Sequence, residues 1–142
     1  MSSTKREAVC GIHSAAIHLL RRVREEDESM GITPARASAL SVLVFGGARS
    51  LTELAAAERV TPATMSRLVA ALEREKLVRR FPDVDDARSI RIEATARAER
   101  ILKRGQARRL DLLERLLADA TETEVAAVRT AAEVVERALQ SA

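Results

Sequence analysis

The sequence is poor in aromatic residues, cysteine and glycine. Two of its 142 residues are Phe and none is Trp or Tyr, so the core has to be built from aliphatic side chains. A single cysteine excludes an internal disulfide and a four-cysteine zinc site. There are only five glycines, and no phosphate-binding glycine loop, HExxH motif or Ser-His-Asp order occurs. We therefore expect no enzyme, no catalytic residues, no cofactor and no bound metal.

Long apolar runs and a strong net charge are also missing. No apolar run approaches the roughly 20 residues that span a bilayer, and the N-terminal residues lack the apolar centre of a signal peptide. We therefore expect a cytoplasmic protein with no membrane partner. The 24 basic residues exceed the 21 acidic ones by three, which is too little to argue for nucleic-acid binding. Evidence for nucleic-acid binding must therefore come from where the basic residues are placed in the chain.

Two helix starts follow each other closely in the middle of the chain. Ser50 and Glu53 have capping-box spacing: the hydroxyl can accept from the third backbone N–H, and the glutamate can reach back to the serine N–H. A short helix is therefore expected to begin at Leu51. Thr61 followed by Pro62 marks a second start, because threonine is a good N-cap and proline is tolerated at the first helical position.

The second of these helices divides into a buried stripe and an exposed face. Apolar residues recur at i, i+3, i+4 and i+7, namely at Met65, Leu68, Val69 and Leu72. The opposite face carries Thr64, Ser66 and Arg67. Short side chains let a helix enter the major groove, hydroxyls bond bases or phosphates, and arginine grips guanine bidentately. Taken alone, this face is more typical of an ordinary solvated helix, and only the neighbouring elements favour DNA.

A short two-stranded hairpin is predicted next. Its apolar groups are Leu77, Val78 and Phe81 in the first strand and Ile90 and Ile92 in the second. Arg91 alternates with the two isoleucines, the period of a half-buried strand. At the polar tip, Asp86 and Arg88 lie two residues apart and point the same way, so the carboxylate can hold the arginine in position. An arginine on a thin loop suits a narrow minor groove. The alternative is a solvated turn with an incidental ion pair.

Short matches to one protein family run along this stretch. They are Leu54-Ala55, Val60-Thr61, Ser66-Arg67-Leu68-Val69, Leu72-Glu73, Leu77-Val78-Arg79-Arg80, the segment from Asp83 to Arg88, and a helix opening at Thr95. In these residues the chain resembles the MarR family of bacterial transcription regulators, essentially over its whole length. The resemblance implies a mainly α fold with a small β-hairpin wing: a winged helix-turn-helix with N- and C-terminal dimerisation helices. It further implies major-groove or phosphate contacts at Thr61, Thr64, Ser66 and Arg67, and a minor-groove contact at Arg88, oriented by Asp86.

The chain departs from the family's pattern at its turns. The wing tip of the family often reads Asp-Pro-x-Asp-Arg-Arg, whereas this chain has Val84 for the proline and Ala87 for the first arginine. Arg59 stands where a glycine is common in the helix-turn-helix turn, and Lys76 where a glycine commonly ends the recognition helix. Ala98 replaces the usual glycine after the wing. The departures at the wing tip put one phosphate or groove contact in question. None of the departures changes the expected fold.

Helices with apolar residues at three-four spacing are expected at both ends of the chain. The first seam is Val9, Ile12, Ala16, Leu19 and Val23, and the last is Val125, Val128, Ala132, Val135 and Leu139. Between them, Thr33-Pro34 starts a helix that Gly46-Gly47 stops, Thr95 caps a long helix that is leucine-rich in its second half, and Thr121 and Glu124 form another capping box.

These apolar seams predict helices exchanged between two subunits, and the resemblance implies the same homodimer. We expect one domain over residues 1–142, with a DNA-binding lobe at 34–94 and dimerisation helices at 6–28 and 95–140. The alternative is a monomeric helical bundle.

Cys10 and His13 are the candidate sensing residues, three apart on the first helix. One interpretation is a small apolar interface cysteine beside a solvated histidine. A second is a thiol redox switch, as in some members of the family, although that branch pairs the cysteine with tyrosines and this chain has none. A third is a metal site completed across the dimer, for which the spacing is weak.

Together these features predict a sequence-specific DNA-binding transcriptional regulator. The interpretation that fits best is a ligand-responsive repressor that binds a pseudo-palindromic operator on double-stranded DNA as a homodimer. By resemblance, a small-molecule effector would bind between the dimerisation helices and the DNA-binding lobe. The alternatives are a winged-helix module that binds protein, and a redox-sensing regulator based on Cys10.

Overall fold

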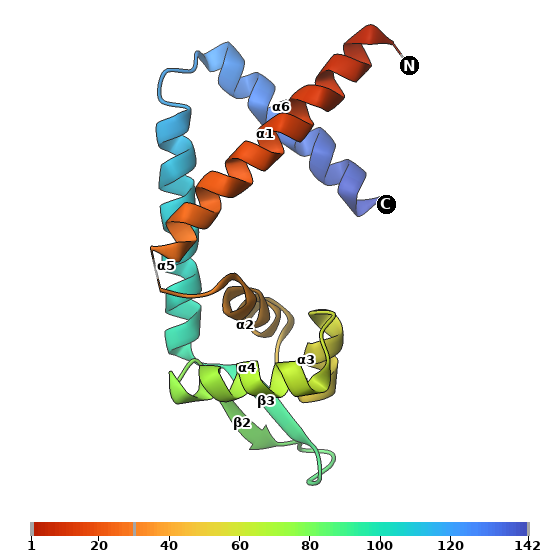
Figure 1. The fold of residues 1–142 in the computed structure, drawn as a ribbon, viewed down its shortest axis with the longest axis vertical. Helices are drawn as coiled ribbons and strands as arrows, with labels where there is room; N and C mark the ends of the chain where they lie inside the picture. The colour runs from red at the N-terminus through yellow and green to blue at the C-terminus, as the bar shows by residue number, and fades with distance from the viewer. Residues whose placement is uncertain (1, 30, 142) are drawn as a thin grey trace. The chain divides into compact units, whose positions relative to one another are not determined.

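The computed structural model describes residues 2–29 and 31–141, which form a mainly helical fold with a small antiparallel sheet (Figure 1). The helices are α1 (Ser3–Glu28), α2 (Pro34–Gly46), α3 (Leu51–Ala57), α4 (Pro62–Arg74), α5 (Ala96–Leu116) and α6 (Glu122–Gln140). The strands are β1 (Arg49–Ser50), β2 (Val78–Pro82) and β3 (Ile90–Ala94). The chain divides into two compact units, residues 1–109 and 110–142. None of the described helices is long and apolar enough to cross a membrane.

The predicted helix starts are confirmed by their caps. The side chains of Thr33, Ser50 and Thr61 each accept a hydrogen bond from the backbone N–H three residues on, at 3.1 to 3.3 Å. Pro34 and Pro62 occupy the first turns of α2 and α4, where a missing N–H costs nothing. These signals are local, which is why the sequence alone located the helices.

The sheet has the strand order β1-β3-β2, with all pairs antiparallel. The predicted hairpin is confirmed as β2 and β3, which pair from Val78 opposite Ala94 to Pro82 opposite Ile90. The third strand was not predicted: the two residues of β1 pair with β3, Arg49 opposite Ile92. Ile92 is buried as expected, but Ile90 is 45% exposed, because it lies at the end of the strand beside the loop, where the core no longer reaches.

An aliphatic core holds together the winged-helix lobe, by which we mean residues 34–94. Met65, Val69 and Leu72 of α4 are buried, and Leu68 packs against them, so the predicted stripe is confirmed. The buried members from the other elements include Ala39, Leu40 and Leu43 of α2, Leu54 and Ala55 of α3, Leu77, Val78 and Ile92 near or in the sheet, and Ala98 of α5. The methyl group of Ala98 is completely buried, so the core accommodates a side chain where the family usually has glycine.

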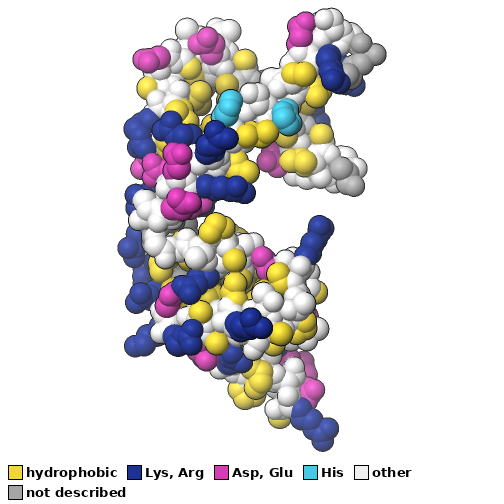
Figure 2. Space-filling view, in the orientation of Figure 1, with side chains coloured by type: hydrophobic (Ala, Val, Ile, Leu, Met, Phe, Trp, Pro, Cys, Tyr) yellow, Lys and Arg dark blue, Asp and Glu magenta, His cyan; other side chains and the backbone are white. Residues whose placement is uncertain are grey.

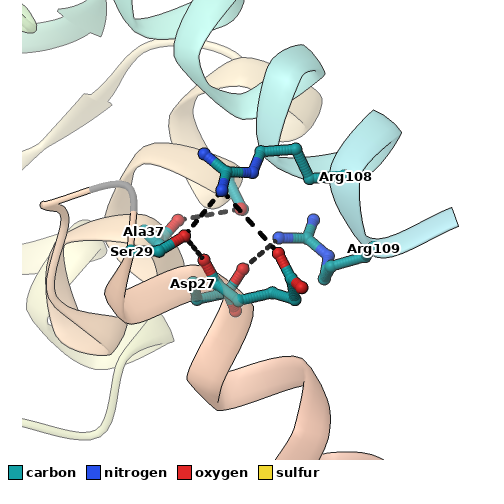
Figure 3. Close-up of polar contacts among 7 residues, drawn as sticks. Asp27, Ser29, Ala37, Arg108 and Arg109 are labelled. Carbon is teal, nitrogen blue, oxygen red and sulfur yellow. Dashed lines mark hydrogen bonds and ion pairs between the residues drawn. The ribbon is translucent and has the colours of Figure 1, made fainter. Parts of the chain in front are cut away.

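The C-terminal end of α1 is tied to α5 by charged hydrogen bonds (Figure 3). Arg109 donates to Asp27 at 2.8 Å, and Arg108 donates to the hydroxyl of Ser29 at 2.8 Å while lying 3.8 Å from Glu26. These side chains are partly exposed, so each ion pair is worth at most about 1 kcal/mol. The ion pairs therefore contribute little to the free energy of folding, and their main effect is to join the C-terminal end of α1 to α5.

The second unit opens α6 with a complete capping box. The hydroxyl of Thr121 accepts from the N–H of Glu124 at 3.2 Å, and the Glu124 carboxylate accepts from the N–H of Thr121 at 2.8 Å. The Thr121 hydroxyl also donates to this carboxylate at 3.1 Å. The bonds that the carboxylate accepts from the Thr121 backbone and then from its hydroxyl hold the pKa of Glu124 below its ordinary value. The predicted box is therefore confirmed.

Apolar side chains on α1 and α6 remain accessible. No described residue of either helix is buried. The exposed apolar residues on the two helices include Val9, Ile12, Ile17, Leu19, Leu20, Val125, Val128, Val134 and Leu139. Each helix thus presents an apolar surface that a further partner could cover.

Candidate nucleic-acid interface

The first turn of α4 presents two threonines to solvent. Thr61 donates its hydroxyl proton to the oxygen of Thr64 at 3.0 Å and accepts the N–H of Thr64 at 3.2 Å. Both residues are exposed. Because Thr64 accepts from Thr61, its own hydroxyl proton can be donated outward, for example to a phosphate oxygen. The exposed N-terminus of a helix of this length also favours an anion through its dipole.

Ser66 and Arg67 follow on the face of α4 opposite the buried stripe. Ser66 is half-buried and Arg67 is exposed. Within the described part of the chain, the Arg67 guanidinium has no hydrogen-bonding or ionic partner. No existing ion pair would have to break for Arg67 to reach a base edge or a phosphate.

The loop between β2 and β3 is shaped by two aspartates that bind backbone. The carboxylate of Asp83 accepts from the N–H of Asp85 at 2.9 Å, and that of Asp86 accepts from the N–H of Arg88 at 3.0 Å. Such turns are typical of aspartate. Asp86 therefore orients Arg88 through its backbone, whereas the sequence suggested a grip on the side chain.

The loop projects past α4, and basic side-chain atoms lie at its tip (Figures 1 and 2). Arg88 and the neighbouring Val84 and Ala87 are all exposed, Val84 to 96%. The two residues that depart from the family pattern thus lie on the loop surface. They alter what the loop presents to a partner and not how the lobe folds.

Two non-glycine residues adopt left-handed backbone conformations at the turns that flank α4. Arg59 has φ 55° and Lys76 has φ 58°, the two positions where the family commonly has glycine. After Lys76, the N–H of Leu77 bonds the carbonyl of Leu72 at 2.9 Å, which closes the end of α4. Arg59 and Lys76 therefore keep the left-handed backbone that glycine usually adopts at these turns, although their side chains make this conformation sterically unfavourable.

Arg91 lies at the base of the wing, and the sequence did not identify it as functional. Its guanidinium donates to the carbonyl of Ala48 at 2.6 Å and lies 3.7 Å from Glu53 and 3.8 Å from Asp83. Glu53 was expected to complete the cap of α3, but its carboxylate faces Arg91. Its alternation with Ile90 and Ile92 predicted only that Arg91 points away from the core. The sequence could not identify its partners, because they come from three separate segments of the chain.

The candidate sensing residues on α1 are both exposed. Cys10 is a free thiol and His13 lies one turn further along the same helix. Among residues 2–29 and 31–141, no group of three or more His, Cys, Asp or Glu side chains is arranged to hold a metal ion. The structure does not bring Cys10 or His13 to the interface formed by α4 and the wing.

Comparison with known proteins matches this architecture. A model of the MarR family matches residues 32–90. An uncharacterized HTH-type transcriptional regulator of Mycobacterium leprae is 30% identical over 104 residues, which are 72% of this chain and 73% of that protein. A solved MarR family protein from Bacillus stearothermophilus is 25% identical with a TM-score of 0.80, and the match covers 99% of both chains. A Staphylococcus aureus MepR variant bound to an oligodeoxyribonucleotide shares the fold at 19% identity, with a TM-score of 0.74 over 93% of this chain and 97% of that one.

Proposed function

Because this chain belongs to the MarR family of DNA-binding transcription regulators and is not an enzyme, we propose that it is a ligand-responsive repressor that binds a pseudo-palindromic operator as a homodimer. The observation that carries the proposal is the presence of two arginines whose guanidinium groups have no partner among the described residues. Arg67 lies on the exposed face of α4 and Arg88 on the projecting wing loop. This arrangement suits simultaneous contact with a major groove and the adjacent minor groove.

Each predicted contact residue has a distinct role in this proposal. Arg67 reads a base or grips a phosphate in the major groove, and the hydroxyls of Thr61, Thr64 and Ser66 hold phosphates or base edges beside it. Arg88 enters the minor groove, and Asp86 keeps the loop in shape through the backbone bond already described. The solved MepR variant was bound to an oligodeoxyribonucleotide, which is consistent with DNA as the partner of this fold.

The exposed apolar faces of α1 and α6 support the homodimer. Isolated apolar side chains on a surface are ordinary, but rows of them at helical spacing favour a partner helix. A second copy of the chain would bring the same rows. In a two-fold dimer the two α4 helices would enter successive major grooves about 34 Å apart, so the operator should be a pseudo-palindrome.

A cleft between α2 and α5 supports the response to a ligand. Its volume is about 360 Å³, within the range of small-molecule sites. Its lining combines the apolar Val44, Phe45 and Leu102 with the polar Ser41, Glu99, Lys103, Gln106 and Arg109. Because Arg109 also holds Asp27 of α1, a ligand in this cleft could alter how α1 is attached to the lobe.

Two alternative functions predict different results in DNA-binding measurements. A winged-helix module that binds protein would show no salt-dependent affinity for duplex DNA. A redox-sensing regulator would bind DNA only while the exposed Cys10 thiol is reduced, and the variant Cys10→Ser would bind equally with and without peroxide.

The test is selection of duplexes from a random-sequence pool by the reduced, purified protein, followed by affinity measurements at several salt concentrations. We expect a pseudo-palindrome to be enriched, and the logarithm of its affinity to fall linearly and steeply with the logarithm of salt concentration. Absence of enrichment, with weak binding that does not depend on salt, would contradict the proposal and favour the protein-binding module.

A further inference from the structure

Three separate segments of the winged-helix lobe meet at the side chain of Arg91. Ala48, whose carbonyl accepts from Arg91 at 2.6 Å, precedes β1. Glu53 lies in the first turn of α3, and its carboxylate is 3.7 Å from the guanidinium. Asp83 lies at the start of the wing loop, with its carboxylate at 3.8 Å. Arg91 is thus the point at which the wing contacts the start of the helix-turn-helix.

An arginine is suited to this position by its shape. Its planar guanidinium carries five N–H donors in a fixed fork, so it can serve acceptors in several directions at once, whereas lysine is a flexible point charge. The side chain of Arg91 is 29% exposed and that of Asp83 is 22% exposed, so the carbonyl bond and the pair with Asp83 are partly shielded from water, whereas Glu53 is more exposed. Arg91 also lies opposite Ser50 in β1 and opposite Phe81 in β2, which places it in the central strand of the sheet.

The contact with Asp83 continues along the wing loop to Arg88. Besides accepting from Asp85, Asp83 donates its own N–H to the carbonyl of Ser89 at 2.9 Å. Ser89 in turn donates to the carbonyl of Asp86 at 2.9 Å, and the Asp86 carboxylate holds the backbone of Arg88. The ion pair between Arg91 and Asp83, followed by this series of hydrogen bonds, therefore links Arg91 to the tip of the wing.

We propose that Arg91 is a positioning residue that holds the wing against α3, so that Arg88 and Arg67 reach the same operator half-site together. The proposal rests on the DNA-binding function proposed above. Arg91 itself does not touch the DNA in this scheme. Without it, the wing loop keeps its local turns but loses its fixed direction, and Arg88 makes its groove contact only part of the time.

A double-mutant cycle on operator binding tests this coupling. In the otherwise native protein, we expect Arg88→Ala to reduce affinity for the selected operator about tenfold or more. In an Arg91→Met background the same Arg88 substitution should change affinity less than about twofold, because the contact is already largely lost. Arg67→Ala serves as the matched control and should cost the same factor in both backgrounds. Hydroxyl-radical footprints of Arg91→Met should lose protection in the flanking minor grooves and keep it around the major grooves.

A second variant guards against a simple loss of folding. Asp83→Asn keeps an oxygen for the Asp85 N–H but removes the negative charge facing Arg91, and it should show the same reduced effect of Arg88→Ala. Equal costs of Arg88→Ala in native, Arg91→Met and Asp83→Asn proteins would overturn the proposal and show that Arg91 acts independently, for instance as a direct phosphate contact. Failure of the native protein to bind any selected duplex would instead refute the proposed function itself.

Discussion

The arginines of the winged-helix lobe include two contrasting groups at the scale of single residues. Arg36, Arg80 and Arg91 lie within ion-pair distance of carboxylates, and these pairs join neighbouring elements of the lobe. The side chains of Arg59, Arg67, Arg74 and Arg88 are exposed and have no partner among the described residues. Of these, Arg67 lies on the exposed face of α4 and Arg88 on the wing loop. Because a free guanidinium gives up only water when it binds an anion, the second group is the better source of DNA contacts.

Arg67→Ala should therefore weaken operator binding by about 1–3 kcal/mol and relax the preference for the base that it reads. Arg88→Ala should also weaken binding, most strongly on operators with a narrow flanking minor groove. Fluorescence anisotropy with matched duplexes measures both effects. Arg100→Ala, which removes an exposed arginine of α5, is the control and should bind normally. Unchanged binding by both Arg67→Ala and Arg88→Ala would refute the assigned contacts.

The left-handed backbone at Lys76 makes a prediction about stability. A side chain at φ 58° crowds the following carbonyl, a strain of roughly 1–2 kcal/mol that glycine avoids, partly offset by the greater freedom of glycine in the unfolded chain. Lys76→Gly should accordingly raise the free energy of unfolding by about 1 kcal/mol in urea titrations. Lys103→Gly, at an exposed position inside α5, should lower it by a similar amount. Destabilisation by Lys76→Gly would mean that the strain is absent in solution.

At the scale of elements, helix ends are determined by hydrogen bonds that reach only three residues. Thr33, Ser50, Thr61 and Thr121 cap four helices in the same way. Only Thr121 has its box completed by a glutamate in the described chain, because Glu53 faces Arg91. The same sequence pattern can thus serve either a cap or a tertiary ion pair, depending on what lies nearby.

The capping box of α6 predicts a pH dependence. Hydrogen bonds from Thr121 lower the pKa of Glu124 in the folded protein from its ordinary value of 4.5, so the ionised form is favoured by folding. This stabilisation should be present above the ordinary pKa and lost as the pH falls through the lower, folded value. In NMR titrations the midpoint of Glu124 should lie below its ordinary value. The stability difference between the native protein and Glu124→Gln should shrink over that acidic range, and a constant difference would contradict the assignment.

At the scale of the whole molecule, the apolar rows on α1 and α6 require an explanation. A homodimer would bury them, and it would also place two copies of the winged-helix lobe on one operator. The monomeric bundle considered from the sequence would leave no need for a symmetric operator.

Placing a charge in the α6 row should therefore break the dimer. Val128→Glu would bury an unpaired carboxylate at the interface, so we expect sedimentation equilibrium to show a monomer or a much weaker dimer, with reduced operator affinity. Val84→Glu makes the same exchange on the wing loop, where the side chain is already exposed, and should remain dimeric. A monomeric native protein, or an unaffected Val128→Glu dimer, would refute the proposed assembly.

By itself, the sequence determined the starts of α2 to α6, the hairpin, the aliphatic stripe of α4 and the family, because these depend on residues close together in the chain. The first helix was expected from residue 6, but α1 begins at Ser3 with Ser2 as its cap. The exposed positions of Thr64 and Arg67 followed from the helical period of α4, whereas Thr61 was placed by its cap pattern and Arg88 by the polar tip of the hairpin. Only the tertiary structure decided the third strand, the exposure of Ile90 and the place of Arg91. A two-residue strand has no period to detect, and the carbonyl that Arg91 binds lies 43 residues away. Such pairings depend on how the elements pack in space, and no local pattern in the sequence encodes that packing.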